Sequence, residues 1–130
     1  MSASEVVRVP ADTSLADELA FEEVVEMANL TAAQTGVTGT IFISTAMGQH
    51  GPRVKFFIQP GRTQPSFSVS IGDTPAVVAN SLPARIVRQM SPQVFEFVLR
   101  NKDALLDFWH HGDTWTQPEV NDFIQKLRPV

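Results

Sequence analysis

Three residues in the middle of the chain have side chains that could hold an anion. His50, Arg53 and Lys55 lie close together in the sequence. If residues 53–58 form a strand, Arg53 and Lys55 point to the same face, because side chains alternate along a strand. With His50 just before them, two or three cationic donors could converge on a carboxylate or a phosphate. The alternative is an ordinary polar sheet face, exposed to water or covered by another element.

A serine-rich strand is predicted next along the chain. Residues 66–71 alternate strictly, with Phe67, Val69 and Ile71 inward and three serines outward. If this strand pairs with residues 53–58, its hydroxyl groups lie beside the cations. The candidate ligand-binding residues are therefore His50, Arg53, Lys55, Ser66 and Ser68.

Two aromatic residues, Phe42 and Phe57, are predicted on the polar side of their strands. One interpretation is a stacking platform for single-stranded nucleic acid, flanked by cations. The other is burial of that face, either by the first helix or in a homodimer, where aromatic residues are enriched. We favour burial, and we treat Phe42 and Phe57 as candidate interface residues.

The sequence contains no pattern typical of a catalytic or metal site. It has no Cys and no Tyr, which excludes thiolate ligands, a Cys nucleophile and a phenol acid. His110 and His111 follow Asp107, but adjacent histidines on a helix point about 100° apart, and we interpret them as residues of a helix C-terminus. We therefore predict no catalytic residue, no metal site and no cofactor, and the sequence leaves open whether the chain is an enzyme.

These candidates need a sheet to position them, and the periodicity predicts one. Strands are expected at 38–45, 53–58, 66–71 and 76–79, joined by short loops that favour antiparallel pairing. A helix is expected from Ser14, with an apolar stripe that ends at Ala28. Further helices are expected at 81–90, restarting at Pro92 and running to Trp109, and after the capping box at Thr116. The expected class is α+β: an antiparallel sheet of about four strands, an N-terminal helix and two C-terminal helices. We expect one domain over residues 1–130, with 1–12 as a loosely ordered arm.

Charge is divided unevenly along the chain. The net charge of −4 gives no overall attraction for nucleic acid or an anionic membrane. Residues 1–26 carry seven acidic side chains and one basic, whereas residues 50–102 carry seven basic and two acidic. Either an acidic helix neutralises a basic sheet, or a basic surface remains for an anionic ligand. No apolar run is long enough to span a membrane, and the first residues do not resemble a secretory signal, so we expect a soluble cytoplasmic protein.

Two blocks of the sequence resemble a family of short uncharacterised prokaryotic proteins. They are Thr35-Gly-Val37 with Ile41-Phe-Ile-Ser44 and His50-Gly-Pro-Arg-Val-Lys55, and Asn101-Lys-Asp-Ala-Leu-Leu-Asp-Phe-Trp109 with Gly112. A looser similarity links Gln64-Pro-Ser-Phe-Ser-Val69 to bacterial domains that carry two histidines on this strand, both absent here. The resemblance implies a shared fold and a bacterial source but no activity.

The sequence therefore favours a noncatalytic binding or assembly module that acts as a homo-oligomer. The alternative is a binding protein or an enzyme that handles a phosphorylated or carboxylated metabolite through His50, Arg53 and Lys55. A third hypothesis, single-stranded nucleic-acid binding through the same strand face, is less favoured, and no membrane partner is expected.

Overall fold

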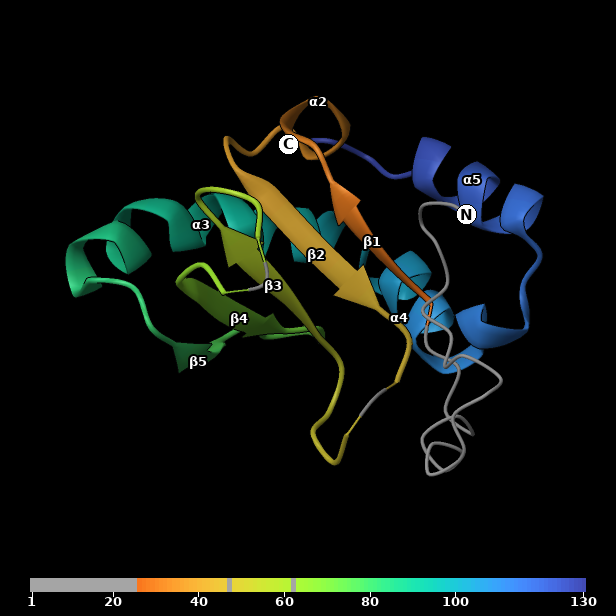
Figure 1. The fold of residues 1–130 in the computed structure, drawn as a ribbon, viewed down its shortest axis with the longest axis horizontal. Coiled ribbons are helices and arrows are strands. Elements are labelled where there is room, and N and C mark those ends of the chain that lie inside the picture. Colours follow the sequence, from red (N-terminus) through yellow and green to blue (C-terminus); the bar gives the residue numbers. More distant parts are fainter. Residues whose placement is uncertain (1–25, 47, 62) are drawn as a thin grey trace.

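The structure, a computed structural model, describes residues 26–46, 48–61 and 63–130 (Figure 1). Five antiparallel strands form one sheet in the order β1-β2-β3-β4-β5, so each strand pairs with its neighbour in the sequence. The strands are β1 (Met27–Leu30), β2 (Thr40–Ser44), β3 (Arg53–Phe57), β4 (Ser66–Ser70) and β5 (Val77–Asn80). The helices are α2 (Ala32–Thr35), α3 (Ala84–Arg100), α4 (Lys102–His111) and α5 (Gln117–Gln125), with a 3-10 turn at Gly112–Thr114. The predicted α+β class with an antiparallel sheet is confirmed.

The sheet has one apolar face and one polar face because side chains alternate along every strand. Strand pairing aligns four buried side chains in a row across β1 to β4: Leu30, Ile41, Phe56 and Phe67. The adjacent row, on the opposite face, is Asn29, Phe42, Lys55, Ser68 and Ala79. Helices α3 and α4 lie behind the sheet in Figure 1 and pack on the apolar face. We call the face away from these helices the outer face.

The three longer helices each contribute a buried stripe to the core. The buried residues are Val94, Phe97 and Val98 of α3, Leu105, Phe108 and Trp109 of α4, and Val120 and Phe123 of α5. The rings of Phe108 and Phe123 stack with centroids 4.9 Å apart and planes 9° apart. The predicted capping box before α5 is confirmed, since the Thr116 hydroxyl accepts from the Glu119 N–H while Glu119 accepts from the Thr116 N–H.

The sequence pattern does not predict the first strand. It favours a helix that ends at Ala28, but Ala28 lies in β1 and pairs with Ile43. Pairing with β2 and burial of Leu30 outweigh the weak helical preference of this segment. The rest of the predicted helix, residues 14–25, and the predicted arm, residues 1–12, lie outside the described residues. The strand predicted at 53–58 is one residue shorter in the structure, because β3 ends at Phe57, and Ile58 is 46% exposed.

The break between the C-terminal helices is also displaced from its predicted position. The pattern predicts a break at Ser91-Pro92, but α3 continues through Pro92 to Arg100. Proline removes one helical hydrogen bond, and the buried stripe that follows keeps the helix continuous. The chain instead leaves helical geometry at Asn101, where φ is −118° and ψ is 19°.

Asn101 ties this break to the end of the chain. Its side-chain amide donates to the carbonyls of Phe97 (2.9 Å) and Arg128 (3.0 Å), and its Oδ1 accepts from the Arg128 N–H (2.7 Å). The residue is 4% exposed, so water cannot replace these partners readily. A short polar side chain thus fixes the path of residues 126–130 against the α3–α4 junction.

We expect Asn101→Ala to lower the free energy of unfolding by about 2 kcal/mol, because three hydrogen bonds are lost and one buried carbonyl loses a partner. Asn121→Ala is the matched control, since Asn121 is exposed and accepts only one hydrogen bond, from Gln117; it should change stability by less than about 0.5 kcal/mol. Urea unfolding followed by tryptophan fluorescence measures both. Equal effects of the two substitutions would contradict the role given to Asn101.

Candidate functional site

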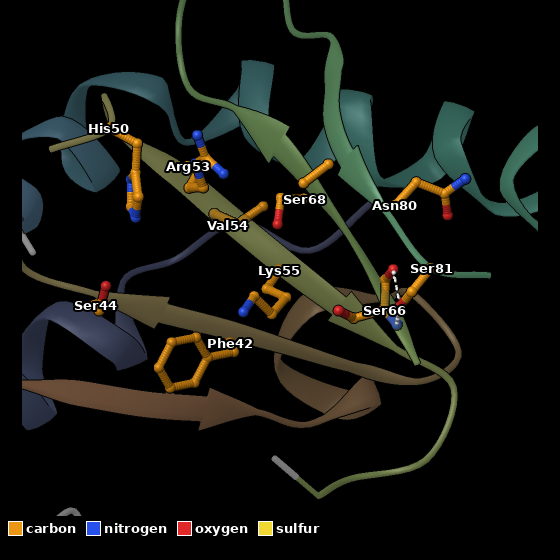
Figure 2. Close-up of a pocket in the computed structure, with 11 residues that line it drawn as sticks. Phe42, Ser44, His50, Arg53, Val54, Lys55, Ser66, Ser68, Asn80 and Ser81 are labelled. Atoms are coloured by element: carbon orange, nitrogen blue, oxygen red, sulfur yellow. Dashed lines mark hydrogen bonds between the residues drawn. The ribbon is translucent and has the colours of Figure 1, made fainter. Parts of the chain in front are cut away.

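A pocket of about 350 Å³ lies on the outer face of the sheet, over β2 to β5 (Figure 2). Most of its lining residues are polar, and two of them, Arg53 and Lys55, are cationic. The lining residues are Phe42, Ser44, His50, Arg53, Val54, Lys55, Ser66, Ser68, Ala79, Asn80 and Ser81. The structure thus brings together all five predicted ligand-binding residues, together with Phe42. Phe57 does not line this pocket.

The antiparallel register places the cations and the hydroxyl groups side by side. Arg53 and Lys55 are two residues apart on β3 and share the outer face. Lys55 pairs directly with Ser68 on one side and with Phe42 on the other. In Figure 2 the Lys55 side chain extends from β3 toward β2, and the Ser68 hydroxyl points in the same direction. Ser68 is 2% exposed, so it lies at the base of the pocket rather than on an open surface.

His50 reaches the pocket from the loop between β2 and β3. Its ring centroid lies 5.8 Å from that of Trp109, and its Nδ1 lies 3.1 Å from the Gly51 carbonyl oxygen. Trp109 itself is 4% exposed in α4. The buried indole thus gives the exposed imidazole a fixed neighbour at the rim of the pocket.

Residues from β5 complete the pocket, and the sequence pattern does not predict them. The register between β4 and β5 shifts at Ser68/Val69, and Asn80 and Ser81 line the wall beyond the predicted end of the strand. The Ser81 hydroxyl accepts from the Ser66 N–H (3.1 Å) and donates to the Ser66 carbonyl (3.3 Å). These two hydrogen bonds hold Ser81 beside β4 at the side of the pocket. A shift of this kind has no signature in the sequence. Ser44, by contrast, falls on the predicted outer side of its strand, and the alternation alone could have identified it.

The two pocket cations have no carboxylate partner among the described residues, in contrast to Arg100, Lys102 and Lys126. Lys102 pairs with Asp73 (2.9 Å), and Arg100 pairs with Glu96 (2.7 Å). The hydrogen bond and the charge of Lys102 hold the pKa of Asp73 below its usual value, and the same contact raises the pKa of Lys102. Arg53 and Lys55, both partly buried, form no ion pair with the residues that the structure describes.

Arg53 carries a further unsatisfied group. Its Nε is a buried nitrogen with no hydrogen-bond partner among the described residues. A buried N–H without a partner costs about 1–3 kcal/mol. This nitrogen is therefore a donor that the described residues leave unused.

The two aromatic candidates are separated. Phe42 is half-buried and lines the pocket, whereas Phe57 is 6% exposed and lies between Thr40 and Ser66 in the strand register. Both belong to the outer face, as predicted, but they do not form one exposed platform. Phe57 therefore offers little surface to a partner.

A second hollow, of about 470 Å³, lies between α4 and α5, and its charged groups are already satisfied. Asp107 contacts His111 (3.0 Å), and Asp122 contacts Lys126 (3.0 Å). Its third carboxylate, that of Glu119, accepts from the Thr116 N–H as part of the helix cap. The contrast identifies the sheet pocket as the better candidate site.

Residues 26–46, 48–61 and 63–130 contain no group of three His, Asp or Glu side chains arranged to hold a metal ion. His110 and His111 are exposed in the last turn of α4, where cationic side chains suit the helix dipole. In this same described part, no helix has both the length and the apolar character needed to cross a bilayer.

Comparisons of the chain with models of protein families, with curated proteins and with solved structures found no significant match. The function must therefore be inferred from the geometry of the pocket.

We expect Arg53→Met to raise the free energy of unfolding by about 1 kcal/mol when no ligand is present. The substitution removes the buried unsatisfied N–H and the repulsion between Arg53 and Lys55, and it keeps most of the aliphatic stem. Arg100→Met is the control, because Arg100 binds Glu96 and the Pro129 carbonyl; it should be neutral or destabilising. Thermal unfolding at low salt measures both, and a destabilised Arg53→Met would show that Arg53 has a structural role instead.

Proposed function

We propose that the protein is a noncatalytic binding module that holds a small phosphorylated or carboxylated molecule in the pocket on the outer face of its sheet. The observation that supports this most directly is the pairing state of the cations. Arg53 and Lys55 line a concave, partly buried site in which no described lining residue carries a carboxylate. Such a site attracts an anion, because the positive charges have no counter-charge among the described residues and are partly shielded from water.

The other lining groups support the same ligand class. The hydroxyl groups of Ser66 and Ser68 can donate to anionic oxygens, and Asn80 keeps its amide N–H groups for other partners while its Oδ1 accepts from the Leu82 N–H (2.8 Å). The volume of about 350 Å³ is near the lower end of the range of small-molecule sites. A single small molecule therefore fits better than a polymer.

Binding without catalysis is supported by the composition of the pocket. General acid–base catalysis needs a positioned proton acceptor, which is often oriented by a carboxylate. Among its described residues the pocket has one titratable group other than its two cations, His50, and the Nδ1 of His50 faces the carbonyl of the next residue. The described lining offers no carboxylate to orient this imidazole or to act with it.

Inorganic phosphate should stabilise the wild-type protein against heat, and Arg53→Met and Lys55→Met should each weaken its binding by about tenfold or more. Each substitution removes a charge-assisted hydrogen bond worth about 1.5–3 kcal/mol. Isothermal titration calorimetry and the phosphate-induced shift in melting temperature both test this.

Arg88→Met is the control, since Arg88 is exposed on α3 and does not line the pocket; this variant should bind phosphate as the wild type does. Equal weakening by Arg88→Met would indicate a general charge effect and would contradict a defined site.

A second candidate function is assembly into a homo-oligomer, which the position of β5 favours. Within the described residues β5 lies at the edge of the sheet, and Val78 on it is 47% exposed. An exposed edge strand can pair with the same strand of a second copy.

If this edge mediates assembly, Val78→Lys should convert the oligomer to a monomer, because a charged edge residue opposes strand pairing. Leu99→Lys provides the control. Leu99 is about as exposed as Val78, at 49%, but it lies near the C-terminal end of α3 and not on the edge strand. Size-exclusion chromatography with light scattering measures the mass, and a wild-type monomer at high concentration would rule out this function.

A further inference from the structure

Phe42 is the feature of the pocket that anion binding alone does not explain. Its half-buried ring lies on the outer face, away from the apolar core, and it is not among the residues that pack in that core. The ring also makes no ring–ring contact with any residue that the structure describes. Packing in the core therefore does not account for an aromatic side chain at this position.

The register gives this ring a definite place in the site. Phe42, Lys55 and Ser68 are direct neighbours across β2, β3 and β4. Figure 2 shows the ring beside the Lys55 side chain, at the β2 side of the pocket. When a ligand places its anionic group at Lys55, the rest of the ligand therefore lies close to Phe42.

The charge of the pocket indicates the kind of anionic group. Two formal positive charges and several hydroxyl groups line it, with no carboxylate among the described lining residues. A phosphate monoester near pH 7 carries about −1.5 to −2 charges and three acceptor oxygens. A carboxylate carries one charge and two oxygens, so it would leave one cation and part of the donor set unmatched.

We propose that the pocket binds a phosphate monoester carried on an aromatic ring. Arg53 and Lys55 hold the phosphate, Ser68 donates to it from the base of the pocket, and the ring of the ligand stacks against Phe42. This inference rests on the anion-binding function proposed above and specifies the ligand class. The small volume restricts the ligand to about one ring system with its phosphate.

Calorimetry with four probes tests the proposal on the full chain: inorganic phosphate, phenyl phosphate, cyclohexyl phosphate and benzoate. Phenyl phosphate should bind about three- to tenfold more tightly than cyclohexyl phosphate, because a flat ring stacks on Phe42 and a puckered ring does not. Both esters should bind more tightly than benzoate. Phe42→Leu should remove the preference for phenyl over cyclohexyl phosphate and leave the affinity for inorganic phosphate within about twofold.

Phe95→Leu is the matched control, since Phe95 is also partly buried but belongs to α3 and does not line the pocket; it should keep the preference. The comparison of phenyl with cyclohexyl phosphate on the wild type needs no variant, so it holds even if Phe42→Leu folds poorly. Equal affinity for these two esters, or benzoate binding as tightly as phenyl phosphate, would overturn this inference and leave an anion site standing. Failure of all four probes to bind would overturn the anion-binding function itself.

Discussion

The alternation of side chains along an antiparallel sheet is the constraint on which the rest of this structure depends. One row of residues, Leu30, Ile41, Phe56 and Phe67, is committed to the core beneath the helices. The adjacent row must then face the opposite way, and this fixes Phe42, Lys55 and Ser68 as neighbours. A slip of one residue in register would move the core residues to the outer face, so the hydrophobic effect that specifies the core also specifies the site.

This coupling explains how far the sequence could predict the site. The strict alternation in β3 and β4 is enough to predict Arg53, Lys55, Ser66 and Ser68 on one face, and the short loop between these strands makes them neighbours. The contribution of Asn80 and Ser81 could not be predicted, because both lie beyond the predicted end of the fourth strand. Their positions are set by the pairing of Asn80 with Phe67 and by the hydrogen bonds of Ser81 to Ser66, which leave no local pattern in the sequence.

The errors in the predicted fold have a similar cause, since each arises where tertiary contacts outweigh local preference. The segment at Ala28 has weak helical character, but it pairs with β2 and completes the sheet edge. Pro92 is a strong local signal for a helix start, but α3 passes through it because Val94, Phe97 and Val98 are buried as one stripe. Conversely, Asn101 has no distinctive signal in the sequence, and its three hydrogen bonds to backbone groups are visible only in the structure.

Some charged side chains are paired within the fold, whereas the two cations of the pocket are not. Asp73 with Lys102 and Glu96 with Arg100 neutralise each other within the fold, and they therefore offer little to a ligand. Arg53 and Lys55 have no carboxylate partner among the described residues, and the buried Nε of Arg53, which has no hydrogen-bond partner among them, costs stability. Both cations line one concave site, and the proposed anionic ligand would supply the negative charge that the described lining lacks.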